Sequence, residues 1–255
     1  MEDLNYLWSF IVIYGIIMVR YSIVALAFYL IYYKLFRKKF ERKKIQLKFP
    51  KDKDYLREVK YSLMAICFFG FAGVLVLRSP ISQFNQVYFD FYEMPLWYFF
   101  ACFPIMILIH DTYFYWMHRA IHHKKIYKRV HLVHHKSTNP SPWAAYAFHP
   151  IEAILEAAIL PILAFVMPLH ISAFGIFFLF SIMYNVYGHS GFELYPRNFH
   201  KHWIGKYINT SVHHNLHHKE FNNSYGLYFT FWDRAMGTMA EKYDSAFEEV
   251  ASRVY

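Results

Sequence analysis

The sequence predicts an all-α integral membrane protein with four to five transmembrane helices and a histidine-rich helical cap on the cytosolic side. Three observations lead to this fold class. Of the 255 residues, 56% are hydrophobic and 22% are aromatic, which is too apolar for an ordinary soluble domain. Several apolar stretches are long enough to cross a bilayer. All 16 histidines lie between His110 and His218.

The apolar stretches that could span a bilayer follow one another along the chain. They are Trp8–Phe36, Tyr61–Leu77, Pro95–Trp116 and Ile151–Tyr187, the last being long enough for two passes joined near Pro168. Arg20 interrupts the first stretch, and a mid-membrane arginine costs at least about 2.5 kcal/mol unless it pairs or reaches the interface. The first helix is therefore expected to consist of two shorter pieces.

Positive charge indicates which side of the membrane each loop occupies. The formal charge of +9 is gathered in blocks beside apolar stretches, which is typical of cytosolic flanks and not of a nucleic-acid-binding surface. The loop at residues 37–60 is strongly basic, whereas the loop at residues 79–94 contains no Lys or Arg. The histidines from His118 onward, except His170, should therefore face the cytosol. The short chain favours a bacterial inner membrane; in a eukaryote, the endoplasmic reticulum is expected.

The histidines occur at the spacings of metal ligands on helices. His118 and His122 are four residues apart, so their rings project from the same face of a helix. The pattern HxxHH occurs twice, at residues 131–135 and 214–218, and gathers its rings on one helical face. His189 ends the last apolar stretch, where it could reach the site from the membrane. The predicted catalytic metal ligands are His118, His122, His131, His134, His135, His189, His214, His217 and His218.

Nine imidazoles are too many for one metal ion. A zinc ion takes three or four protein ligands, so nine ligands predict two ions with open positions for O₂. Imidazole suits iron, zinc, copper and nickel, so the ligand type alone does not choose among them. A lipid-accessible site favours two iron ions, Fe²⁺ or Fe³⁺, because an oxygen-activating centre can attack an unactivated C–H bond. Zinc is the expected substitute.

Three segments resemble the fatty acid hydroxylase / sterol desaturase superfamily of membrane-bound di-iron lipid oxygenases. They are HDTYFYWMHRAIHHKKIYKRVHLVHHKS at residues 110–137, NPSPWAAYAFHP at 139–150 and SVHHNLHHKEFNNSYGLYFTFWDRAMGT at 211–238. The resemblance implies a catalytic domain at residues 95–240. Membrane anchor helices and a basic cytosolic loop at residues 1–94 precede this domain, and a tail at residues 241–255 follows it. The resemblance also implies a membrane arrangement of four helices and a cytosolic cap that holds the metal ions.

The resemblance assigns the nine histidines to the family's ligand positions. Some fatty acid hydroxylases place a further histidine four residues after the position of His189, where this chain has Glu193. That difference favours the sterol-desaturase-like branch and makes Glu193 the candidate tenth ligand. Residues expected to support the ligands from outside are His110, Asp111, His123, His149 and His213. Asp233 and Arg234 are expected to form a structural ion pair or a clamp near the last histidine motif. His170, His200 and His202 are expected to be surface or interfacial residues.

The predicted function is therefore that of an oxidoreductase, a monooxygenase or desaturase, that hydroxylates or desaturates a lipid with O₂. The chain carries no haem-binding or flavin motif, so the electrons should come from a separate electron-transfer protein. The basic loop at residues 124–129 would suit an acidic protein of this kind. Two alternatives stay open. A zinc-dependent membrane lipid hydrolase or isomerase would use the same ligands, and a non-catalytic scaffold would bind lipid without converting it.

Overall fold

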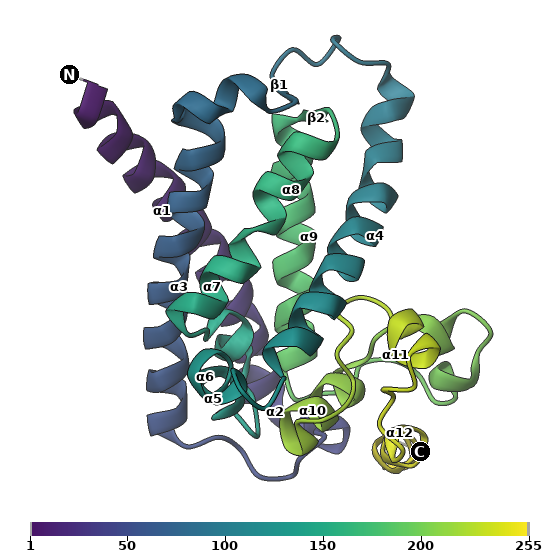
Figure 1. The fold of residues 1–255 in the computed structure, drawn as a ribbon. Coiled ribbons are helices and arrows are strands. Elements are labelled where there is room, and N and C mark those ends of the chain that lie inside the picture. The colour runs from purple at the N-terminus through teal and green to yellow at the C-terminus, as the bar shows by residue number, and fades with distance from the viewer. Residues whose placement is uncertain (1, 254–255) are drawn as a thin grey trace.

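The computed structural model describes residues 2–253, which form an almost entirely helical protein (Figure 1). The long helices are α1 (Glu2–Phe28), α3 (Asp52–Arg78), α4 (Leu96–Ile121) and α9 (Ile171–His189). The shorter α-helices are α2 (Arg37–Phe40), α5 (Tyr127–Val130), α6 (Leu132–His135), α7 (Pro150–Ala157), α8 (Ile159–Val166), α10 (Ser211–Glu220), α11 (Phe231–Ala235) and α12 (Tyr243–Ser252). A π-helix, Tyr29–Leu35, and 3-10 turns at Glu41–Lys43, Pro80–Phe84, Pro142–Tyr146, Phe199–Lys201 and Gly205–Tyr207 connect them.

Four helices of the described chain are long and apolar enough to cross a membrane, which confirms the predicted all-α membrane fold. They are Asn5–Leu35, Asp52–Arg78, Leu96–Ile121 and Ile171–His189. Residues 151–187 were expected to be long enough for two passes. In place of the first pass, the structure has two helices of eight residues each, α7 and α8, which are separated at Ala158. Each is too short to span a bilayer alone, which needs about 20 residues.

The first helix is one continuous element, so the prediction of two shorter pieces is wrong. α1 runs through Arg20 and continues without a break as the π-helix Tyr29–Leu35. Arg20 is half-buried, and its guanidinium carbon lies 5.9 Å from the ring centroid of Phe178 on α9. The aromatic ring offers the cation a favourable face within the bundle, so the helix does not need to break there.

Close packing of α1 against α3 and α9 builds the core on the histidine side of the bundle. Gly70 of α3 makes the contact with α1 possible, because a Cβ atom there would lie 2.9 Å from the Phe10 ring. Below this contact, Tyr21 is buried and donates a hydrogen bond to the carbonyl of Trp143, 2.8 Å away. This bond attaches the transmembrane helices to the segment that follows the second histidine motif.

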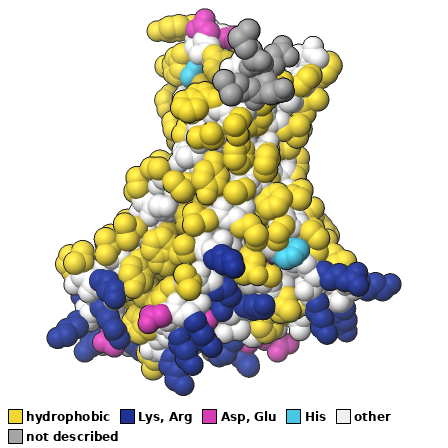
Figure 2. Space-filling view, turned by 90° about the vertical axis from the view of Figure 1, so that its left-hand side faces the viewer, with side chains coloured by type: hydrophobic (Ala, Val, Ile, Leu, Met, Phe, Trp, Pro, Cys, Tyr) yellow, Lys and Arg dark blue, Asp and Glu magenta, His cyan; other side chains and the backbone are white. Residues whose placement is uncertain are grey.

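The two ends of the bundle differ in charge and in structure. At one end, the two-residue strands β1 (Val87–Tyr88) and β2 (Leu169–His170) pair in parallel, with Val87 opposite Leu169. The other end carries α5, α6, α10, α11 and α12, which form a broad cap (Figure 1). Figure 2 shows Lys and Arg side chains gathered around this broad end and hydrophobic side chains covering the column above it. The cap is therefore the basic end of the molecule.

Candidate metal centre

The nine histidines predicted as ligands come together in the structure as two adjacent groups. The first group contains His118, His122, His131, His135 and His217, and the second contains His134, His189, His214 and His218. Within each group, one nitrogen of every ring lies within 4.8 Å of those of the others. Five and four imidazoles are ligand sets of the size that a pair of metal ions requires.

Helix geometry decides which group each ring joins. Among the nine predicted ligands, each pair four residues apart ends in the same group, as His118 and His122 do at the end of α4. Consecutive residues point about 100° apart on a helix, so His134 joins the second group and His135 joins the first. His217 and His218 of α10 divide in the same way. α6 and α10 therefore lie between the two groups and contribute to both.

Local sequence places these helices where the rings can meet. Thr210 caps α10 by accepting a hydrogen bond from the backbone N–H of His213, 3.2 Å away. The helix ends at Phe221, which has a φ of 69°. His149 caps α7 by accepting from the N–H of Ile151, and Pro150 occupies the first helical position. His149 thus caps α7 and belongs to neither histidine group.

Hydrogen bonds fix the proton of four rings on Nδ1. His118 donates to the carbonyl of Tyr225 (2.9 Å), and His217 donates to that of Asn223 (2.7 Å). His189 donates to its own helix at Asn185 (2.8 Å). Nδ1 of His131 lies 2.6 Å from a carboxylate oxygen of Glu152. Because carbonyl and carboxylate oxygens accept protons, each of these rings presents a bare Nε2 lone pair to its group.

The ring nitrogens within each group lie close to one another, as the ligands of a shared cation do. Nε2 of His118 lies 3.0 Å from Nε2 of His131, although neither carries the proton that a hydrogen bond would need. In the second group, Nε2 of His189 lies 3.0 Å from that of His214 and 3.2 Å from that of His218. The residues present therefore fit two bound metal ions, since converging lone pairs repel one another without a cation between them.

Burial keeps the ligand rings uncharged. It lowers the pKa of His122 to about 2, with the neighbouring His118 adding to the effect. Burial, and after it the neighbouring histidines, also hold the pKa well below its ordinary value at His134, His135, His214, His217 and His218. Neutral imidazole is the form that binds metal, so the protein maintains the ligands in their binding state at neutral pH.

Two buried carboxylates hold the loop that supports the first group. Asp111 accepts hydrogen bonds from the backbone N–H groups of Tyr228 (2.7 Å) and Phe229 (3.1 Å). Asp233 accepts from those of Tyr225 (2.9 Å) and Gly226 (2.8 Å). Together they fix the Tyr225 carbonyl, to which His118 donates. Asp111, which was expected to support the ligands from outside, binds this loop.

The predicted ion pair between Asp233 and Arg234 does not form. Asp233 is buried and lies 3.4 Å from Nε2 of His213, while Arg234 donates to the carbonyl of Lys206 (3.0 Å). Burial opposes ionisation of Asp233, but hydrogen bonds from His213 and its other donors outweigh it and hold the pKa below its ordinary value. Adjacent residues on a helix point in different directions, so Arg234 cannot follow Asp233 into the interior.

Glu193 lies outside both histidine groups and supports α10 instead. Its two carboxylate oxygens accept hydrogen bonds from the Tyr187 hydroxyl (2.8 Å) and from the backbone N–H groups of Tyr195 and Val212 (both 3.0 Å). Val212 belongs to the first turn of α10, where a negative charge stabilises a helix. Glu193 thus positions the helix that carries three of the nine rings.

The other expected supporting histidines also lie outside the two groups. His110 is buried, with Nδ1 3.0 Å from the hydroxyl of Tyr228. His123 is exposed, and His213 turns away toward Asp233. His202 is exposed as predicted. His170, by contrast, is buried and caps α9, and His200 is buried with Nε2 3.7 Å from Glu248. These two are therefore not exposed at the surface, because β1 and α12 cover them.

Sequence reasoning missed Glu152, the carboxylate that touches a ligand ring. Glu152 is fully buried on α7, two residues after Pro150. The signal was present, since an acidic residue in a mostly apolar helix beside a histidine cluster usually has a specific partner. Its contact with His131 resembles the carboxylate–histidine pairs that orient metal ligands.

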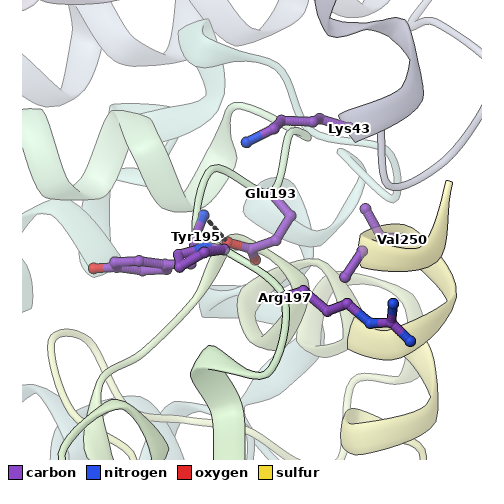
Figure 3. Close-up of a pocket in the computed structure, with 7 residues that line it drawn as sticks. Lys43, Glu193, Tyr195, Arg197 and Val250 are labelled. Atoms are coloured by element: carbon purple, nitrogen blue, oxygen red, sulfur yellow. Dashed lines mark hydrogen bonds between the residues drawn. The ribbon is translucent and has the colours of Figure 1, made fainter. Parts of the chain in front are cut away.

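A surface pocket of about 270 Å³ lies next to Glu193, between the segment after α2 and α12. Figure 3 shows its lining, with Lys43 and Arg197 on opposite sides and the Glu193 carboxylate turned toward the backbone of Tyr195. A smaller pocket of about 230 Å³ touches the ligand ring of His214 and is lined by Tyr184, Gly188 and Leu227 among others. This smaller pocket therefore touches the second histidine group at the ring of His214.

Comparisons with known proteins agree with this geometry. The family model described as fatty acid hydroxylase matches residues 103–238. Human lathosterol oxidase is 32% identical over 194 residues, which is 75% of this chain and 62% of that protein. A probable Delta(7)-sterol 5(6)-desaturase of Neurospora crassa is 34% identical over 195 residues, or 76% of this chain and 54% of that protein. The chain thus matches less than two thirds of either relative's length. No solved structure matches it significantly.

Proposed function

Because the chain belongs to the fatty acid hydroxylase / sterol desaturase superfamily and to its sterol-desaturase branch, we propose that it is a membrane-bound di-iron oxidoreductase that hydroxylates or desaturates a lipid. The observation that carries the proposal is the pair of histidine groups with bare, converging Nε2 atoms. Nine neutral nitrogen donors in two adjacent sets suit two ions with open coordination positions.

Each group would hold one iron ion, with the first taking five ligands and the second four. The chemistry that bound iron supplies is the O₂-dependent oxidation of an unactivated C–H bond. The chain's own residues prepare the site for it. Tyr225, Asn185 and Asn223 hold the ring protons on Nδ1 through their carbonyls, and Glu152 does so through its carboxylate. This fixes the orientation of the rings before metal binds.

The proposed substrate is a sterol-like lipid that reaches the site from within the bilayer. Two facts support this substrate class: the names of both relatives refer to sterols, and His118 and His189 stand at the ends of membrane-spanning helices. The gathering of Lys and Arg around the cap favours a cytosolic location for the histidine groups. Electrons would come from a separate electron-transfer protein, and the exposed Lys124, Lys125, Lys128 and Arg129 would attract an acidic one.

The experiment combines metal analysis with a search for the product. The full-length protein would be purified from membranes and its iron counted, and lipids of cells with and without the gene would be compared for a gain of one oxygen or a loss of two hydrogens. We expect two irons per chain, and loss of product in His134→Ala and His135→Ala, which remove one ligand from each group. His123→Ala, which removes an exposed ring next to a ligand, should change neither.

Other outcomes would replace the proposal. Turnover of a lipid by zinc-loaded protein without O₂ or reductant would identify a hydrolase or isomerase. Lipid that co-purifies with the protein but is unchanged in every iron-loaded preparation would identify a binding scaffold. Full product formation in His135→Ala would show that the first group is not the site of oxidation.

A further inference from the structure

Large apolar side chains are exposed on a part of the cap that lies outside the four membrane-spanning helices. Trp203 is 72% exposed and Phe231 is 55% exposed. Ile204, Tyr207 and Met236, which lie close to them in the sequence, are also exposed. They belong to two segments, residues 199–207 and 230–236, which we call the lobe. Soluble surfaces rarely expose so many large apolar side chains together unless something binds there.

The lobe is firmly built, so loose packing does not account for the exposure. Thr230 joins its two segments, because its N–H donates to the carbonyl of Tyr207 (2.9 Å) and its hydroxyl donates to that of Lys206 (2.7 Å). The indole N–H of Trp232 donates to the Thr112 hydroxyl of α4, 3.2 Å away. The exposed side chains are therefore displayed on a fixed frame beside α4.

The lobe surface is continuous with the lipid-facing surface of α4. Trp116, near the end of that span, is 44% exposed, and its ring centroid lies 5.6 Å from that of Trp232. The rings of Trp232 and Phe231 are 5.5 Å apart. In Figure 1, α11 lies beside the lower end of α4, where a bilayer crossed by α4 would end. The exposed aromatic residues thus stand at the depth where membrane proteins concentrate Trp and Tyr.

The charge of the lobe complements an anionic surface. From Leu194 to Lys219 the sequence contains no Asp or Glu. Lys206 and Arg234 flank the exposed Tyr207, with their cationic groups 5.0 and 5.9 Å from its ring centroid. Lys201 instead pairs with Glu248 of α12. Apolar and aromatic side chains interleaved with basic ones are typical of surfaces that lie in the headgroup region of a bilayer.

We propose that the lobe is a second, peripheral contact with the bilayer that the four helices cross. Trp203, Ile204, Tyr207, Phe231 and Met236 enter the headgroup region, and Lys206 and Arg234 bind anionic phospholipid. The spanning helices already hold the chain in the membrane, so the lobe meets lipid at high effective concentration and a modest apolar area is enough. This inference is independent of the metal and of the oxidised lipid.

The test measures the depth of the lobe in the bilayer. Full-length protein with Cys67 and Cys102 replaced by alanine would carry one cysteine, from Trp203→Cys or Phe231→Cys, labelled with an environment-sensitive fluorophore. Lys242→Cys is the matched control, because Lys242 is exposed just before α12, the helix that lies at the lower edge of the cap in Figure 1. The protein would be placed in nanodiscs that hold a single copy, and the lipids would carry a spin-label quencher near the top of the acyl chain.

We expect the lipid quencher to reduce the fluorescence at positions 203 and 231 by about two-fold or more, and to leave position 242 nearly unchanged. Aqueous iodide should quench the fluorophore at position 242 more strongly than those at positions 203 and 231. Adding phosphatidylserine should increase the inserted fraction by up to about five-fold for each contacting cation, and Lys206→Gln should remove much of that response whereas Lys242→Gln should not.

Equal accessibility of all three positions to iodide, with no lipid quenching at 203 or 231, would overturn the proposal. Shielding of these positions only in discs that hold two copies would do so as well, because the surface would then be a contact between chains. Two labelling sites on separate segments guard against a variant that fails to fold.

Discussion

Replacing Lys44 by methionine should stabilise the protein at neutral pH. Lys44 lies between the first two transmembrane helices, and its side chain is fully buried. Its ammonium group has one hydrogen bond, a long one of 3.4 Å to Asn139, and lies 5.4 Å from the ring centroids of Phe49 and Phe192. These contacts compensate only part of the cost of removing a charge from water.

Burial lowers the pKa of Lys44 from 10.5 to about 8. This difference corresponds to about 3 kcal/mol of folding free energy at neutral pH. Because the unfolded chain holds the proton more tightly, the free energy of unfolding of the wild type should rise as the pH rises from 8 to 10.5. The advantage of Lys44→Met should therefore be full below pH 8 and fall to about 1 kcal/mol at pH 10.

The assay is thermal unfolding of purified protein in detergent at pH 7 and pH 10. A gain of about 3 kcal/mol corresponds to an increase in Tm of about 6 to 12 °C for a chain of this size. Lys48→Met, which changes an exposed lysine in the same loop, should leave Tm nearly unchanged at both pH values. A variant that is less stable than the wild type by the same amount at pH 7 and pH 10 would refute the reasoning, because the buried charge would then be a net stabilising contact.

Three further substitutions examine the supports of the histidine groups. Glu152→Ala removes a ligand's partner and should weaken Co²⁺ binding, measured by chelator competition, about 10–100-fold. Glu152→Gln should weaken Co²⁺ binding less than Glu152→Ala does, and Glu156→Gln should not weaken it. Equal Co²⁺ affinities of all three variants and the wild type would show that Glu152 does not orient His131. Asp233→Asn places an amide N–H donor against the backbone N–H groups of Tyr225 and Gly226, and should lower the free energy of unfolding by about 1–3 kcal/mol. The control Asp244→Asn, at an exposed position, should leave Tm unchanged. Equal Tm values for the two variants would contradict this prediction. Gly191→Ala should lower Tm, because Gly191 has a φ of 73° and the new Cβ would lie 2.8 Å from the Lys44 ammonium group. An unchanged Tm would show that the turn at Gly191 can relax.

Composition and histidine spacing were sufficient to predict the membrane class and the nine rings that gather in the two histidine groups. Both signals are local. A span needs only a run of apolar residues, and a histidine pair four residues apart shares a helical face wherever the helix lies. For this reason His118 with His122, and His214 with His218, could be paired from the sequence, and each pair does join a single group.

Tertiary structure alone decided which helices share a histidine group and what holds their rings. His134 and His135 are neighbours in the chain, yet they enter different groups because α6 passes between the two. Glu152 meets His131 across 21 residues of sequence, and Asp233 is linked to His118 through the backbone of Tyr225. Spacing along a helix determines which way a side chain points, whereas the partner it meets depends on how distant helices pack, and no local pattern encodes that packing.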